Sequence, residues 1–305
     1  MTKRGAKELE RTTVALTILL LLGLAVGCSP KDAPPANDNS STPETGFRAV
    51  VDTSNLVTAR LVTDVESFEA GTPFRLGVVF RIAPKTHVYY RYPGSSGLPT
   101  KIEWALPDGF EVGPLQFPNP ERFEDVDLGD VSYGYEDEAL LFAKVTPPDA
   151  APGSTVTFET HAIWLACMED GLCIPGNAEL AMSLVAGEGA ASADAELFAA
   201  HAARVAKPIS SAPLAVQRSG ETIAVQATDS WRLVADGAQF VPDAGDAWKV
   251  LDADAINLVF EALDDSTSAA LDVGVMTLEM TNEDTVETKT HYLRVGPQTR
   301  AVDVR

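Results

Sequence analysis

Two cysteines near the middle of the chain carry the clearest chemistry in this sequence. Cys167 and Cys173 are separated by five residues, which include Glu169, Asp170 and Gly171. This composition favours a turn, and strand-like apolar segments flank it, so we expect the cysteines at the two ends of a hairpin loop. Residues that face each other across a hairpin have Cα atoms about 4.5 to 5.5 Å apart, which a disulfide can span. The pair can therefore bridge without movement of the backbone.

Several kinds of site are compatible with this pair. A structural disulfide is the usual outcome in an oxidising compartment. A loop this short removes little chain entropy, however, and a bond at a hairpin mouth is open to an attacking thiolate, which favours thiol-disulfide exchange. Cys167, Met168 and Cys173 are also soft ligands of the kind that hold copper(I). Zinc is a weaker option because it requires four ligands, and His161 alone would leave the site open.

The third cysteine, Cys28, has different surroundings. The chain begins with a basic segment, continues with an apolar run from Val14 to Val26, and reaches small residues before Cys28. This is the order of a secretory signal, and the run is shorter than the roughly 20 residues of a membrane span. The segment from Ala25 to Cys28 resembles the lipobox of bacterial lipoproteins, which implies removal of residues 1–27 and acylation of Cys28. The alternative is an ordinary signal peptide cut nearby; both predict export.

The composition describes a folded, acidic chain. It has 305 residues, 44 acidic and 23 basic side chains, and a formal net charge of -21. This length allows about two domains. The acidic balance opposes binding to phosphates, so we expect no nucleic-acid partner. Residues 28–46 are polar and rich in proline, which predicts a flexible tether. No later apolar run could span a bilayer, so the lipid is the only membrane anchor that we expect.

The elements that must position the cysteine pair follow from the hydrophobic pattern. In residues 47–188, short alternating or apolar segments recur between proline and glycine clusters, which predicts an antiparallel β-sandwich. Residues 189–211 change to a helical period behind Ser192 and Asp194 as possible caps, which predicts a connecting helix. The strand pattern resumes in residues 212–305 and predicts a second, smaller β domain. We therefore expect an all-β chain, in which His161 and His201 are ordinary strand and helix residues.

The segment from Cys167 to Pro175 resembles the redox segment of the N-terminal periplasmic domain of the thiol:disulfide interchange protein DsbD. The spacing of five residues is the same, and a proline follows the second cysteine. Upstream segments resemble the branch that includes the copper-sensitivity suppressor ScsB, and they are residues 87–100, 102–104, 106–110, 117–123 and 133–135. The resemblance covers residues 47–185 and extends weakly into the second domain.

This resemblance implies an immunoglobulin-like sandwich that acts as a thiol-disulfide oxidoreductase module without a cofactor. Cys167 and Cys173 would form the redox couple, with Cys173 as the cysteine that forms the mixed disulfide. In that family a cap loop with an aromatic residue covers the pair, and Phe123 is the best candidate here. Tyr89 and Tyr90 match an aromatic segment near the cysteines. For each of these three aromatic residues, a place in the sandwich core is the alternative.

The resemblance also implies the partners. Full-length family members continue into a membrane domain that delivers electrons, and usually into a thioredoxin-like domain; this sequence contains neither, and no Cys-x-x-Cys. We therefore expect thioredoxin-like periplasmic proteins and a separate membrane electron carrier as partners, in processes such as cytochrome c assembly or copper tolerance. The rival interpretations are a non-enzymatic scaffold with a structural disulfide and a copper(I)-holding protein.

Overall fold

The computed structural model describes residues 56–125, 130–149, 152–169, 171–219, 222–242, 248–253, 257–262 and 274–295. The expected signal peptide and tether, with Cys28, lie outside the described residues. Within the described ranges, no helix combines the length and the apolar character that crossing a membrane requires.

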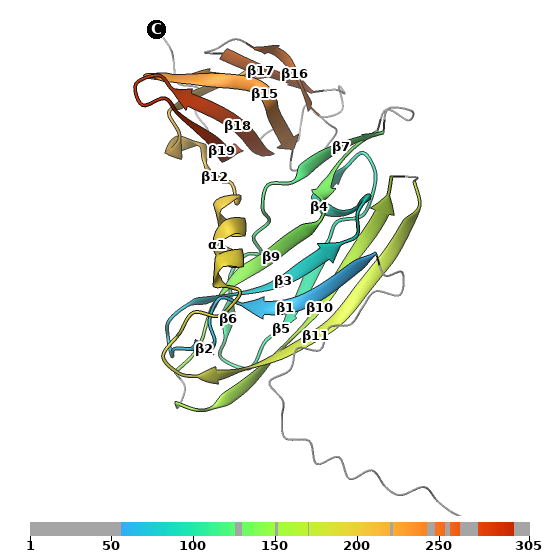
Figure 1. Ribbon diagram of the computed structural model, residues 1–305, viewed down its shortest axis with the longest axis vertical. Helices are drawn as coiled ribbons and strands as arrows, with labels where there is room; N and C mark the ends of the chain where they lie inside the picture. The colour runs from blue at the N-terminus through green and yellow to red at the C-terminus, as the bar shows by residue number, and fades with distance from the viewer. Residues whose placement is uncertain are drawn as a thin grey trace, which may run out of the picture. The chain divides into compact units, whose positions relative to one another are not determined.

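The first part of the chain folds into two β-sheets (Figure 1). In the described residues, a four-stranded sheet has the order β1 (Val57–Thr63), β3 (Phe74–Ile82), β9 (Glu138–Thr146) and β6 (Glu111–Val112). A seven-stranded sheet has the order β2 (Ser67–Phe68), β11 (Cys173–Ala186), β10 (Thr155–Met168), β4 (Thr86–Gly94), β8 (Asp130–Tyr135) and β7 (Glu121–Asp125), with β5 (Lys101–Ala105) also paired to β10. All of these pairings are antiparallel except that of β2 with β11.

The core between the two sheets determines which side chains of each strand point inward and which point outward. Phe158, Ala162, Trp164 and Ala166 alternate along β10 and are buried in this core. The ring of Trp164 meets Phe80 of the opposite sheet edge to face, with centroids 5.5 Å apart. Full burial of one such side chain contributes about 1.5 to 3 kcal/mol, so a shift of the strand by one residue would be costly. The odd-numbered residues of β10 therefore lie on the outer face of the seven-stranded sheet.

Helix α1 (Ala195–Ala203) packs on the four-stranded sheet through Phe198. Phe198 is fully buried in a cluster with Val62, Val79, Leu140 and Phe142. Asp194 lies at the N-cap position but forms no side-chain cap bond, because its carboxylate accepts two hydrogen bonds from Arg60 of β1 at 2.8 and 2.9 Å. The helix is shorter than the segment, residues 189–211, that had a helical period in the sequence. The ion pair between Asp194 and Arg60 fixes the residue at which the helix begins.

The C-terminal part of the chain, from β12 (Lys207–Pro208) onward, also contains two sheets, each four-stranded among the residues that the structure describes. A short 3-10 helix, η1 (Ile209–Ser211), precedes most of it. One sheet has the order β12 (Lys207–Pro208), β19 (Glu287–Val295), β18 (Gly274–Asn282) and β15 (Trp231–Pro242). The other has the order β13 (Leu214–Ser219), β14 (Thr222–Ala227), β17 (Asn257–Ala262) and β16 (Trp248–Ala253). The prediction of an all-β chain with two sandwiches and a connecting helix is confirmed.

Candidate functional site

Cys167 and Cys173 face each other in the last pair of the β10–β11 ladder and are joined by a disulfide. In the hairpin loop, the N–H of Met168 donates to the carbonyl of Leu172 at 2.9 Å, and Gly171 makes the turn with a φ of +85°. The cysteines therefore occupy a position between ladder hydrogen bonds, where opposed residues approach most closely. Their Cα atoms are 4.0 Å apart, which is nearer than the sequence analysis expected.

The two sulfur atoms of this disulfide have different access to solvent. Cys173 is exposed, whereas Cys167 is only 2% exposed although it lies on the outer face of the sheet. His161, on the same face of the same strand, is half-buried, so position on β10 does not explain the burial of Cys167. Neighbouring side chains must therefore cover Cys167.

Tyr89 is one of the residues that cover Cys167. Its hydroxyl donates a hydrogen bond to Cys167 Sγ at 3.1 Å, and the residue is 4% exposed. Burial raises the pKa of Tyr89, and a hydrogen bond with Ser96 offsets this in part. The loop that follows β4 lies close to the ring, because a Cβ at Gly97 would come within 2.3 Å of two ring carbons. The phenol is therefore a fixed, protonated donor at neutral pH.

His87 is a second neighbour, for which the sequence alone predicted no role. It is the cross-strand partner of Cys167 in the β4–β10 ladder. Its ring meets Tyr89 edge to face, with centroids 4.9 Å apart, and stacks on Phe123 at 4.5 Å and 15°. Burial lowers the pKa of His87. Its place two residues before Tyr89, on the same face of a strand, is the signal that could have identified it.

The structure brings Phe123 to the site but not Tyr90. Phe123 lies in β7, pairs with Ser132 of β8, and reaches the site through its stack on His87. Tyr90 is 2% exposed and points to the opposite face of β4, where its ring contacts Phe117 and Tyr135. Tyr90 therefore takes the place in the core that the sequence left open as its alternative.

Acidic side chains surround the mouth of the hairpin. Burial raises the pKa of Glu136, and the neighbouring charges of Glu121, Asp137 and Glu169 raise it further. Glu169 also forms an exposed ion pair with Lys85 at 3.3 Å. The hairpin loop therefore carries an exposed acidic side chain, Glu169, that is paired with the basic Lys85.

The described residues contain no group of three His, Cys, Asp or Glu side chains that could hold a metal ion. The thiolate is the form of cysteine that binds metals, and both cysteine sulfurs are engaged in the disulfide. The copper(I) set of Cys167, Met168 and Cys173 is therefore unavailable in this oxidised form.

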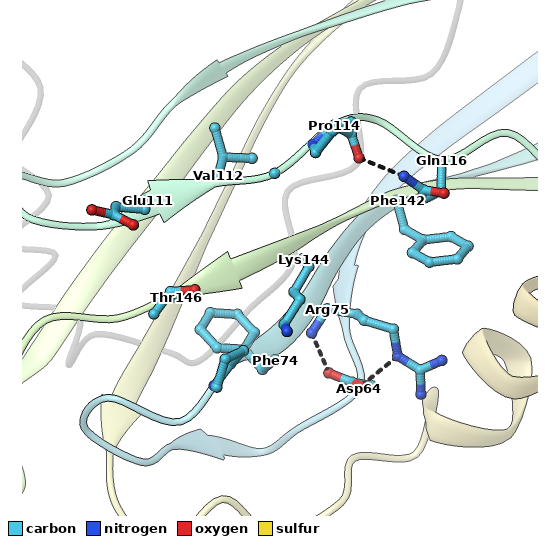
Figure 2. Close-up of a pocket in the computed structure, with 12 residues that line it drawn as sticks. Asp64, Phe74, Arg75, Glu111, Val112, Pro114, Gln116, Phe142, Lys144 and Thr146 are labelled. Atoms are coloured by element: carbon cyan, nitrogen blue, oxygen red, sulfur yellow. Dashed lines mark hydrogen bonds and ion pairs between the residues drawn. The ribbon is translucent and has the colours of Figure 1, made fainter. Parts of the chain in front are cut away.

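A pocket of about 660 Å³ lies elsewhere, on the four-stranded sheet that contains β3, β6 and β9 (Figure 2). Its lining includes Phe74, Phe142 and Lys144, together with Arg75, whose Nε donates to Asp64 at 2.7 Å. Neither cysteine, His87, Tyr89 nor Phe123 lines this pocket. The chemistry of the disulfide therefore belongs to a surface site at the end of the β10–β11 hairpin.

Comparisons with known proteins find one matching family model and solved structures that resemble this chain. Residues 54–184 match the family model described as "Thiol:disulfide interchange protein DsbD, N-terminal". No curated protein sequence matches the chain. The N-terminal periplasmic domain of ScsB from Proteus mirabilis is similar in structure, with 16% identity and a TM-score of 0.56 over 83% of this chain and 98% of that one. The reduced DsbD N-terminal domain from Neisseria meningitidis shares 18% identity over 42% of this chain and 90% of that one, at a TM-score of 0.27. The resemblance found in the sequence is confirmed, and the ScsB domain shows the shared fold.

Proposed function

We propose that this chain, whose residues 54–184 form a domain of the DsbD N-terminal family, exchanges electrons with thioredoxin-like proteins through the Cys167–Cys173 disulfide. The observation that carries this proposal is the unequal environment of the two sulfurs. Cys173 is open to an attacking group, whereas Cys167 is buried against a hydrogen-bond donor. A bond that only braces the fold needs neither feature.

The first step is attack by a thiolate of the partner on Sγ of Cys173. A sulfur–sulfur bond forms between the partner and Cys173, the Cys167–Cys173 bond breaks, and its electron pair leaves on Sγ of Cys167. The leaving thiolate then sits beside the hydroxyl of Tyr89, which is already 3.1 Å away. Hydrogen bonds to a charged group are stronger than those to a neutral one, so this donor favours the departure of Cys167.

The second step resolves the mixed disulfide. A second thiolate of the partner attacks the partner's own sulfur in the mixed disulfide and releases Cys173 as a thiolate. The partner leaves oxidised and this chain leaves reduced by two electrons, and solvent supplies protons to the thiolates as the pH requires. The same steps in reverse pass the electrons to an oxidised protein.

The cellular setting is part of the same proposal. The signal-like N-terminus and the lipobox-like segment ending at Cys28 support export and a lipid anchor facing the periplasm. Thioredoxin-like periplasmic proteins would be the exchange partners, and a separate membrane carrier would supply electrons, in a process such as cytochrome c assembly or copper tolerance.

The experiment that tests the proposal is transfer of electrons from a reduced thioredoxin-like protein. Alkylation of free thiols after mixing should show Cys167 and Cys173 becoming reduced as the partner becomes oxidised, in equal amounts. A Cys167→Ser, Cys173→Ser double variant is the control and should leave the partner reduced. A wild-type pair that stays oxidised while the domain is folded would support the scaffold interpretation instead.

A further inference from the structure

We propose that His87 is a positioning residue for exchange at the Cys167–Cys173 pair, because its imidazole supports Phe123 and Tyr89 beside the buried sulfur. This inference rests on the proposed function and adds to it a residue that acts through its neighbours. It also gives the oxidised site a dependence on pH, because the disulfide itself does not titrate.

The position of His87 is set by the sheet. The β4–β10 ladder places His87 directly opposite Cys167, and cross-strand partners project from the same face of a sheet. Tyr89 is two residues further along β4 and shares that face. His87 therefore lies next to both the sulfur and the phenol that donates to it.

Two ring contacts link His87 to the aromatic side chains of Phe123 and Tyr89. The imidazole lies nearly parallel to the ring of Phe123, with an interplanar angle of 15° and centroids 4.5 Å apart. It meets the ring of Tyr89 at 81°, with centroids 4.9 Å apart. Aromatic rings in such contacts attract each other beyond the effect of burial alone. Phe123 comes from β7 and Tyr89 from β4, so His87 is the ring that joins the two.

The environment of His87 favours the uncharged ring. Its Nε2 atom is buried and has no hydrogen-bond partner among the described residues. A proton added there would bring a charge into a site that lacks an acceptor, and burial accordingly lowers the pKa of His87. The burial of Nε2 and the lowered pKa both favour the neutral imidazole that stacks on Phe123.

Glu136 follows Tyr135, which pairs with Val88 beside His87 in the β4–β8 ladder, and burial raises the pKa of the Glu136 carboxyl. Other charged groups near His87 are in ion pairs. Lys85, two residues before His87, pairs with Glu169 of the hairpin loop at 3.3 Å. On β7, Glu121 lies 3.8 Å from Arg204 and Arg122 pairs with Glu124. The β10 neighbour, Cys167, is in a disulfide and does not titrate. Burial is thus the resolved cause of the lowered pKa.

The sign of the pH dependence follows from this. When Phe123 leaves its place on His87, the imidazole gains solvent and its pKa returns toward the ordinary value of about 6.5. Above that pH both arrangements are neutral, and the stack is fully stable. As the pH falls below it, protonation favours the arrangement in which Phe123 has moved away. The disulfide should then become easier to reduce.

The test compares wild type with His87→Phe, which keeps an aromatic support that cannot titrate. Reduction of the disulfide by a water-soluble phosphine is timed between about pH 8 and about pH 5.5, and the ratio of the two rates cancels the pH dependence of the reagent. We expect the ratio of the wild-type rate to the His87→Phe rate to be near one at the upper pH. This ratio should rise about threefold or more at the lower pH. A ratio that stays flat, or one that falls because the imidazolium binds Phe123 more tightly, would overturn the proposal.

Two further variants keep the result interpretable. His161→Phe makes the same change on the outer face of β10, away from Phe123, and should follow wild type at every pH. His87→Ala removes the support altogether and should be reduced about threefold faster than wild type at the upper pH. Failure of His87→Ala to differ from wild type would count against the support. Failure of the wild-type pair to exchange with a thioredoxin-like protein, with the His87 profile intact, would count against the proposed function alone.

Discussion

Cys167 and Cys173 are cross-strand partners in one β-ladder, yet Cys167 is buried and Cys173 is exposed. The difference arises on the outer face of the sheet, where Tyr89 donates to Cys167 and His87 lies opposite it. The hairpin brings the two sulfurs together. Side chains of the neighbouring strand β4 lie against Cys167, whereas Cys173 stays exposed to solvent.

The first prediction concerns which cysteine forms the mixed disulfide. With Cys167→Ser, the thiolate of the exposed Cys173 should attack a thioredoxin-like protein that lacks its resolving cysteine and carries its remaining cysteine as a mixed disulfide with glutathione. Glutathione leaves as the thiol, and the two proteins stay joined by a disulfide. With Cys173→Ser, the buried Cys167 should trap the same protein at least about tenfold more slowly, because attack requires access to the thiolate. Non-reducing gel electrophoresis over time measures both rates. Equal trapping by the two variants would contradict the asymmetry.

The second prediction concerns the hydroxyl of Tyr89. Tyr89→Phe removes the donor to Cys167 Sγ while keeping the ring. Loss of about 1 kcal/mol of stabilisation of the leaving thiolate should slow reduction by a dithiol about fivefold. The reduction potential should also become more negative by about 20 mV.

Tyr92→Phe is the matched control for this change. Tyr92 lies on the same strand but packs against the core, so its variant should react at the wild-type rate. A Tyr89→Phe variant that is as fast as Tyr92→Phe would show that the hydrogen bond plays no part in exchange.

The third prediction concerns Phe123. Phe123→Ala should increase the rate of reduction by a small phosphine about threefold, because the ring that rests on His87 is lost. In this background, His87→Ala should have no further effect at the upper pH, since the two residues act through one contact. Arg122→Ala, which changes the preceding residue of β7, is the control. Additive effects of Phe123→Ala and His87→Ala would contradict a shared role.

The fourth prediction concerns stability rather than exchange. The hydrogen bond from Arg60 holds the pKa of Asp194 below its ordinary value. A carboxylate with a lowered pKa stabilises the fold above its unfolded-state pKa, and that stabilisation is lost as the pH falls through the lowered value. Asp194→Asn should therefore lower the free energy of unfolding by about 1 kcal/mol at neutral pH and by less below about pH 3.5.

Thermal unfolding at several pH values measures this effect. Glu287→Gln, which breaks an exposed pair with Lys289, is the control and should change stability by less than about 0.5 kcal/mol. If the deficit of Asp194→Asn persists unchanged in acid, the charge of Asp194 is not what anchors the start of α1.

The cysteine pair could be predicted from the sequence because its information is local. Turn residues lie between Cys167 and Cys173, and strand patterns flank them, so the hairpin and the facing of the cysteines follow from a short segment. The sandwiches and the helix follow from periodicity in the same way. The family was recognised from several segments of the same sequence.

The surroundings of the pair could not be predicted, because they depend on strand register. His87 is far from Cys167 in the sequence, and only the β4–β10 ladder makes them partners. The same register separates Tyr89 from Tyr90, because adjacent residues of a strand point to opposite faces. Tyr89 therefore lies at the disulfide, whereas Tyr90, the next residue, lies in the core.

The reduction potential of the Cys167–Cys173 couple tests the central claim most directly. Equilibration of the folded wild-type protein with glutathione buffers, followed by alkylation and mass measurement, gives this potential. The account predicts a value well above about -300 mV, in the range of disulfides that exchange with thioredoxin-like proteins. A value below about -300 mV, or a bond that resists reduction until the domain unfolds, would identify a structural disulfide and contradict the account.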